Sequence, residues 1–215
     1  MEEMNIPFIG CPHSKPQPLV RHILRGQQIR KSVICFLWLF SLLLALFAAI
    51  AGAQEVRPTE SQVKAAYLYN FGKFVRWPVD QASTPDSLNI CVLGKDPFGA
   101  VLDSTVAGES IGGRKISVSR ISRVDEAASC GILFISSSEQ KRSKSIFIAT
   151  QRLEVLTVSD MPHFAEQGGM IEFVTQDGKI RFEVNLGAAQ QSHLALSSEL
   201  LKVATRVIGK GTPGN

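Results

Sequence analysis

The chain has 215 residues, a formal net charge of +4 at pH 7, and hydrophobic side chains at 45% of its positions. The charge is concentrated at the N-terminal end, because residues 1–53 hold five Lys or Arg and two Glu. Residues 54–215 are nearly neutral, with 18 basic and 17 acidic side chains. This part is large enough for one hydrophobic core, and its charge argues against nucleic acid as a partner.

The N-terminal segment has the features of a bacterial export leader. Residues 33–50 contain no charged side chain, follow a basic pair, and lead into the small residues Ala51-Gly52-Ala53. This order is typical of a secretory signal peptide. We therefore expect a leader at 1–53, whose early prolines suggest a start codon assigned too far upstream, and one periplasmic domain at 54–215. The apolar run is nearly long enough to span a bilayer, so an uncleaved inner-membrane anchor is the alternative.

The first periodic segment of the domain is predicted to be an amphipathic helix. Apolar side chains recur at intervals of three and four between Val63 and Val75, and Thr59 stands where an N-cap is expected. The helix should end before Trp77-Pro78, because a residue that precedes proline avoids helical backbone angles. The aromatic side chains here are expected in the core, with an exposed protein-contact surface as the alternative for part of them: Tyr67, Tyr69, Phe71, Phe74 and Trp77.

Strands and helices alternate along the rest of the domain. Hydrophobic patterns predict strands at 88–94, 115–121, 131–135 and 154–158. Helices or helical turns are predicted at 97–104, 125–129, 137–150 and 161–166. A β-hairpin, with strands at 170–174 and 179–186, and a long helix at 187–208 complete the chain. The expected fold is α/β, a single compact domain with a mixed, mostly parallel sheet flanked by helices.

The second hairpin strand carries the candidate contact residues. Strand side chains alternate between two faces, so Arg181, Glu183 and Asn185 should share one face, opposite a row of apolar side chains. These three polar side chains could form hydrogen bonds with a small ligand or a partner protein. A solvent-facing strand with an internal ion pair is the alternative.

The sequence of the domain shows no catalytic or metal-binding motif in the structural context that its chemistry requires. Its two histidines, His163 and His193, lie 30 positions apart, and Ser136-Ser137-Ser138 has no histidine or lysine placed to activate a hydroxyl. The pattern G-x-S-x-G occurs once, at 108–112, but it lies in a predicted turn ahead of a strand, whereas a nucleophile elbow lies between a strand and a helix. The patterns G-x-x-x-x-G-K-[ST], H-E-x-x-H and C-x-x-C do not occur. We therefore expect no enzymatic activity, no metal and no cofactor, with a hydrolase of unrecognised site as a remote alternative.

Cys91 and Cys130 are the two cysteines of the domain. In an oxidising compartment such thiols tend to pair, so we expect a disulfide between them. Two buried free thiols are the alternative.

The order of the segments resembles the YfiR family. The resemblance rests on the following segments, in this order: VKAAYLYNF at 63–71, FVRWP at 74–78, ICVLG at 90–94, DPFG at 96–99, CGILFI at 130–135, VLTVSD at 155–160, GGMI at 168–171 and IRFEVNL at 180–186. It implies a periplasmic regulator of compact α/β fold, often dimeric, that represses a membrane-bound diguanylate cyclase. Release of repression would raise cyclic di-GMP and favour biofilm formation.

The resemblance also bears on the cysteines and on the partner. Cys91 and Cys130 match a structural disulfide of the family, whereas the second pair that some relatives carry nearer the C-terminus is absent here. The expected partner is the periplasmic part of an inner-membrane diguanylate cyclase or sensor kinase, with a homodimer as a further expectation. The alternative function is a small-molecule binding module that feeds a sensor kinase or receptor, with Arg181, Glu183 and Asn185 as contacts.

Overall fold

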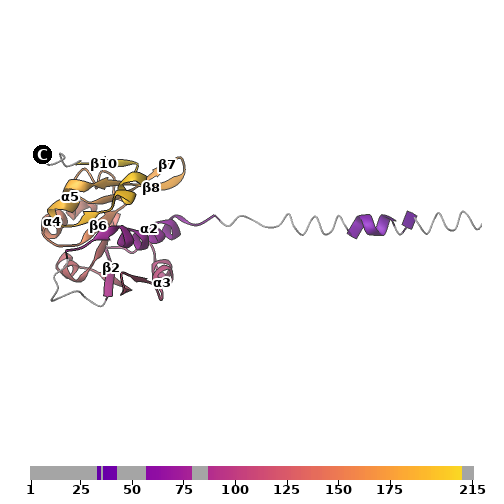
Figure 1. The fold of residues 1–215 in the computed structure, drawn as a ribbon, viewed down its shortest axis with the longest axis horizontal. Coiled ribbons are helices and arrows are strands. Elements are labelled where there is room, and N and C mark those ends of the chain that lie inside the picture. Colours follow the sequence, from indigo (N-terminus) through magenta and orange to yellow (C-terminus); the bar gives the residue numbers. More distant parts are fainter. Residues whose placement is uncertain (1–32, 35, 43–56, 79–86, 210–215) are drawn as a thin grey trace, which may run out of the picture. The chain divides into compact units, whose positions relative to one another are not determined.

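The computed structural model describes residues 33–34, 36–42, 57–78 and 87–209, which are coloured in Figure 1. The chain divides into two compact units, Met1–Val56 and Arg57–Asn215. In the first unit, the described residues are helical and exposed. The rest of the predicted leader, with its cleavage site, lies outside the described residues. No helix among the described residues is both long and apolar enough to cross a membrane.

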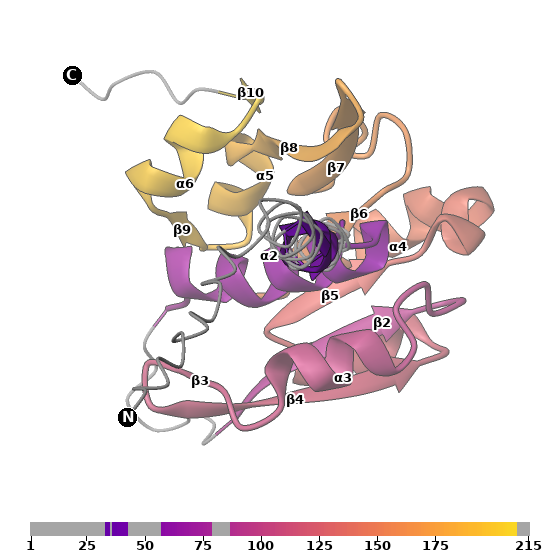
Figure 2. The same cartoon turned by 90° about the vertical axis from the view of Figure 1, so that its right-hand side faces the viewer.

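A mixed sheet of eight strands is the centre of the second unit (Figure 2). The strand order is β10-β8-β7-β6-β5-β2-β4-β3, and all neighbours are parallel except the pairs β7–β8 and β3–β4. The predicted α/β fold with a mostly parallel sheet is confirmed. The strands are β2 (Ser87–Leu93), β3 (Ser110–Ile111), β4 (Arg114–Ile121), β5 (Ile132–Ile135), β6 (Leu156–Ser159), β7 (Ile171–Gln176), β8 (Lys179–Asn185) and β10 (Arg206–Ile208).

A second, two-stranded sheet joins the end of the first helix to the C-terminal part of the domain. Its strands are β1 (Val75–Arg76) and β9 (Ala195–Leu196), which pair antiparallel. The α-helices of the unit are α2 (Glu60–Phe74), α3 (Ala100–Val106), α4 (Ser143–Thr150), α5 (Leu186–Gln191) and α6 (Ser198–Val203). Two 3₁₀ helices, η1 (Val124–Ser129) and η2 (Ser137–Arg142), complete the elements.

Helix α2 begins where the sequence predicts. The Thr59 hydroxyl accepts a hydrogen bond from the backbone N–H of Gln62, and the Gln62 side chain accepts one from the backbone N–H of Thr59. This capping box satisfies two N–H groups that a helix start otherwise leaves without partners. The helix ends at Phe74, because Val75 and Arg76 are already extended and pair with β9.

Alternating side chains of the central strands form two separate hydrophobic clusters. Ile90 and Val92 of β2 belong to the cluster under α2 and α3, whereas Cys91 and Leu93 belong to the cluster under η1 and α4. Strands β5 and β6 are buried along their whole length. Helices therefore cover both faces of the central strands, as parallel sheets require.

The aromatic side chains of α2 divide between core and surface. The rings of Tyr67 and Phe71 pack against those of Phe173 and Phe182, with centroid separations from 5.0 to 5.9 Å. Offset and edge-on pairs at such distances add specific attraction to the burial of apolar area. Phe74 is 37% exposed. The expectation of a core position is thus confirmed for Tyr67 and Phe71, whereas Phe74 is exposed and its role in a protein contact stays a prediction.

The predicted long helix at 187–208 is wrong, because this stretch contains α5, β9, α6 and β10. His193 adopts a left-handed backbone with a φ of 57°, which ends the helical path after α5. The extended residues that follow pair with β1, and the Ser197 hydroxyl then caps α6. The apolar pattern did locate buried residues correctly, since Leu194 and Leu200 lie in the core.

Two shorter helix predictions also need correction. The segment 161–166 forms turns, because the Glu172 carboxylate accepts hydrogen bonds from the N–H groups of His163 and Ala165 and holds His163 at a φ of 61°. The helix predicted at 97–104 starts at Ala100, since Asp96 accepts from the N–H of Phe98 and so closes a turn ahead of it. In the segment 137–150, the first part is the 3₁₀ helix η2.

Cys91 and Cys130 form the predicted disulfide. It ties the middle of β2 to the residue that ends η1, and both cysteines are buried in the second cluster. The bond closes a loop across a sequence separation of 39 residues. It therefore holds η1 against the sheet and limits the freedom of the unfolded chain.

Replacement of both cysteines by alanine should destabilise the domain by about 4 kcal/mol, the chain-entropy value for a loop of this length. Urea unfolding of the full chain, with Cys11 and Cys35 replaced by serine in every sample, measures the free energy of unfolding. A reductant should lower the stability of the disulfide-containing chain to a similar degree and leave the Cys91→Ala, Cys130→Ala variant unchanged. Equal stability of the two chains under oxidising conditions would contradict the prediction.

Candidate functional site

The three polar residues of the predicted contact row have different surroundings in the structure. Arg181 is exposed and forms no ion pair with any described residue. Glu183 accepts hydrogen bonds from the guanidinium of Arg206 on β10, at 2.8 Å from Nε. Asn185 caps α5 by accepting from the N–H of Ala188 and donates through Nδ2 to the carbonyl of Ala165 at 2.7 Å.

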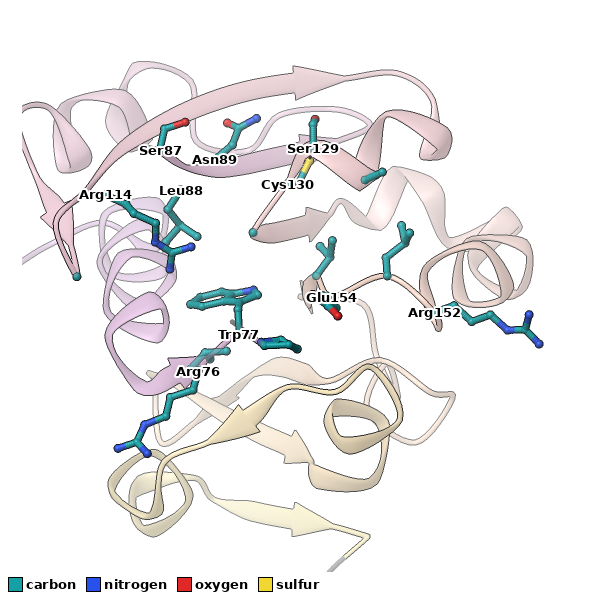
Figure 3. Close-up of a pocket in the computed structure, with 17 residues that line it drawn as sticks. Arg76, Trp77, Ser87, Leu88, Asn89, Arg114, Ser129, Cys130, Arg152 and Glu154 are labelled. Atoms are coloured by element: carbon teal, nitrogen blue, oxygen red, sulfur yellow. Dashed lines mark hydrogen bonds between the residues drawn. The ribbon is translucent and has the colours of Figure 1, made fainter. Parts of the chain in front are cut away.

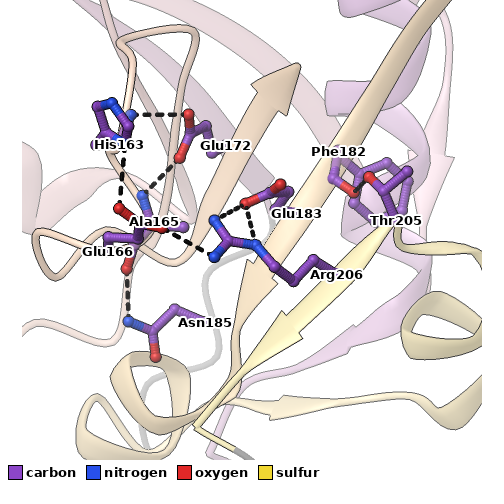
Figure 4. A network of polar contacts seen from close by, with 9 residues as sticks. All are labelled: His163, Ala165, Glu166, Glu172, Phe182, Glu183, Asn185, Thr205 and Arg206. Atoms are coloured by element: carbon purple, nitrogen blue, oxygen red, sulfur yellow. Dashed lines mark hydrogen bonds and ion pairs between the residues drawn. The ribbon is translucent and has the colours of Figure 1, made fainter. Parts of the chain in front are cut away.

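Glu183 and Asn185 therefore take part in a polar network that ties the sheet edge to the turns at 161–169 (Figure 4). Arg206 bridges Glu183 and Glu166, with 2.8 Å between Nη1 and the Glu166 carboxylate, and His163 Nδ1 lies 3.0 Å from the same carboxylate. Both contacts lower the pKa of Glu166 below its ordinary value of 4.5, Arg206 more than His163. The role of Arg181, Glu183 and Asn185 as contacts stays a prediction.

The Arg206–Glu166 pair predicts a pH dependence of stability with a definite sign. Because the folded pKa of Glu166 is lowered, its contribution is complete above the ordinary value of 4.5 and is lost as the pH falls through the folded pKa. We expect Arg206→Gln to lower the melting temperature near neutral pH and to lower it less in acid. Thermal unfolding between roughly pH 3 and 7 measures this difference.

The matched control for this measurement is Arg181→Gln, which removes the same charge from an exposed position on the neighbouring strand. Its effect on the melting temperature should not follow the titration of Glu166. If Arg206→Gln shifts the melting temperature by the same amount at every pH, the ion pair does not contribute as the structure indicates.

A buried cation lies at the C-terminal end of β6. Lys64 of α2 donates to Asp160 at 2.7 Å and pairs with Glu60 at 2.5 Å. Burial by itself lowers the pKa of Lys64, but the hydrogen bonds to the two carboxylates outweigh it, so the pKa is raised. The ammonium therefore stays charged and joins α2 to the sheet, which is a structural role.

A cavity of about 830 Å³ opens at the opposite end of the parallel strands (Figure 3). The starts of β2 and β4, the residues just before β5 and the loop before β6 contribute to its wall, together with β1 and the two residues after it. Its size lies within the range of small-molecule sites, roughly 300–1,000 Å³. Cys130 is part of the wall, so the disulfide holds one side of the cavity in place.

Charged and aromatic side chains meet at this cavity. The guanidinium carbon of Arg114 lies 5.1 Å from the ring centroid of Trp77, which is a cation–π distance. Arg76, Arg152 and Glu154 also line the cavity, and in Figure 3 Arg76 and Arg152 extend away from its centre. Arg76, Arg114 and Arg152 form no ion pair with any described residue. The lining therefore has a surplus of positive charge.

Sequence reasoning did not identify this cavity. Trp77 belongs to an aromatic stretch of the sequence, and Arg114 follows the glycine pair of a predicted turn. Neither position indicates the other, because 36 residues of sequence lie between them and the contact forms only in the folded domain. Among the described residues, no group of three or more His, Cys, Asp or Glu side chains is arranged to hold a metal ion.

Two solved structures are similar to this chain at low sequence identity. A conserved domain protein from Vibrio cholerae O1 biovar El Tor strain N16961 is 12% identical, with a TM-score of 0.47 over 69% of this chain and 60% of the other. The ABC domain from Streptococcus pneumonia in complex with L-Trp is 14% identical, with a TM-score of 0.45 over 67% of this chain and 60% of the other. This chain thus spans about three fifths of each solved chain. No curated protein matches it.

The second unit is an α/β domain with a mostly parallel sheet, one disulfide and a surface cavity. Its sequence matches the YfiR/HmsC-like family over residues 61–205, which is nearly all of that unit. The chain belongs to this family, as the resemblance of its segments indicated. Proteins of the family are regulators rather than enzymes, and they are periplasmic.

Proposed function

We propose that this chain is an exported periplasmic regulator that binds and represses a membrane-bound signalling protein, in the first place a diguanylate cyclase. The observation that carries the proposal is the family match over residues 61–205, which covers the folded unit almost from end to end. A match of this extent includes the core, the disulfide and the hairpin together. The effect of repression would be a lower level of cyclic di-GMP and less biofilm.

Features of the chain itself support an interaction protein. Residues 54–215 carry 18 basic and 17 acidic side chains, so nonspecific attraction to nucleic acid or to anionic lipid is weak. The apolar run at 33–50 with the small residues after it supports export. The identity of the partner, the homodimer and the direction of regulation come from the family resemblance.

Deletion of the gene, followed by measurement of cyclic di-GMP in the cell, tests the proposed sign. We expect a rise in cyclic di-GMP and in biofilm mass, because the cyclase loses its repressor. Expression of the chain with its leader should restore the low level, whereas expression of residues 54–215 without the leader should not, since that product stays in the cytoplasm. An unchanged or lower level after deletion would contradict repression.

Arg181 is the residue of the predicted contact row that remains available to a partner protein. Its side chain is exposed on β8, whereas Glu183 and Asn185 are engaged within the fold. We propose that Arg181 contacts the receptor, where an arginine contributes most once it is desolvated at the interface. Lys179 lies on the same strand and is exposed as well, which makes it a suitable control.

We expect Arg181→Glu to weaken receptor binding by about tenfold or more, because it places a like charge where a complementary one is needed. Lys179→Glu, with the same charge change two positions away, should change the affinity much less. Pull-down of the full chain from detergent-solubilised membranes, with quantification of the captured receptor, measures both. Equal capture by Arg181→Glu and the unaltered chain would remove Arg181 from the interface.

Small-molecule binding is the second candidate function, and the cavity favours it. The lining combines exposed charge with apolar walls, which is the composition of a ligand site. A ligand that prefers one form of the protein would shift receptor binding by the difference in its affinities for the two forms. The two functions are therefore compatible in one domain.

A further inference from the structure

We propose that the cavity binds a small organic polycarboxylate and that Arg114 is the residue that recognises a carboxylate group. The proposal rests on the ligand-binding function suggested above and gives that function a site and a chemical class. It is independent of receptor repression, because binding is measured on the isolated chain.

The first argument is the position of Arg114. It is the first residue of β4, it is partly buried, and its guanidinium lies against the indole of Trp77 at the cavity wall (Figure 3). Contact with the ring restricts the side chain and so orients its planar N–H groups before any ligand arrives. No described carboxylate lies within ion-pair distance of it, although Glu154 lines the same cavity.

The second argument is the charge balance of the lining. Arg76, Arg114 and Arg152 contribute to the lining together with one glutamate, Glu154, and the side chains of Arg76 and Arg152 extend outward from the wall. Other arginines of the domain do have acidic partners: Arg120, Arg123, Arg142 and Arg206. Arginines at and around the wall that lack such partners give this part of the surface a positive potential, which attracts an anion with more than one negative group.

The third argument concerns Trp77 and the apolar part of the wall. Trp77 Nε1 is buried, and it has no hydrogen-bond partner among the described residues. A buried N–H without a partner is costly, so a modest shift of the indole toward a ligand oxygen would be favourable. Val75, Leu88 and Leu153 supply apolar surface beside these polar groups. Such a wall fits a carbon skeleton and would add little to the binding of an inorganic anion.

Citrate is the probe for this site, and the fluorescence of Trp77 is the direct readout. For this measurement Trp38 of the full chain is replaced by phenylalanine, so that Trp77 is the single tryptophan. We expect saturable quenching or enhancement by citrate, together with a rise in melting temperature that sodium chloride at equal ionic strength does not produce. Inorganic phosphate should bind at least about tenfold more weakly than citrate, because it lacks the carbon skeleton.

Arg114→Gln should weaken citrate binding by about tenfold or more, because it removes a charge-assisted hydrogen bond. Arg114→Lys keeps the charge and should give an intermediate affinity. The control is Lys115→Gln, which removes a positive charge from the adjacent, exposed position on the opposite face of β4. Unaltered melting temperatures in the absence of citrate show that each variant is folded.

Three results would overturn the proposal. The first is that citrate changes neither the fluorescence nor the melting temperature beyond the effect of sodium chloride. The second is that phosphate binds as tightly as citrate. The third is that Arg114→Gln binds citrate as well as Lys115→Gln does. Receptor capture by the same chain distinguishes this failure from failure of the proposed regulation. A chain that captures the receptor but ignores citrate lacks the anion site and keeps its regulatory function.

Discussion

The burial of β5 and β6 on both faces is the constraint on which the rest of this structure depends. Every side chain of these two strands is buried, so each face of the sheet needs its own cover. Helices α2 and α3 supply one cover, and η1 and α4 supply the other. The disulfide lies within the second cover, where it joins Cys91 of β2 to the end of η1. Removal of either cover would expose continuous apolar strands to water.

The two ends of the parallel strands differ in what occupies them. The C-terminal end of β6 is occupied by the ion pairs of Lys64, which join α2 to the sheet. The other end of the parallel strands remains open and forms the cavity beside Trp77. Helix α2 leads directly into β1, which reaches this cavity and pairs with β9 of the C-terminal part. The cavity wall is thus connected to the C-terminal part of the domain through β1.

The prediction of β8 as a strand was correct, but it did not determine which polar side chains of the strand remain available for contacts. Alternation along β8 did place Arg181, Glu183 and Asn185 opposite the buried Phe182 and Val184. Sequence could not show that β10 would pair with β8 and bring Arg206 to Glu183. It also could not show that Asn185 would cap α5. Both depend on the path of the chain after the hairpin, which the apolar pattern predicts as one helix.

Sequence by itself determined the α/β class, the start of α2, the hairpin and the pairing of the two domain cysteines. Each of these follows from local periodicity, from a capping residue or from a count of available partners. Tertiary structure decided the four short elements after the hairpin and the meeting of Arg114 with Trp77. The physical reason is that β-pairing and cavity walls join residues distant in sequence. An apolar pattern such as that of Leu194 and Leu200 specifies burial, but it does not specify the backbone path that achieves it.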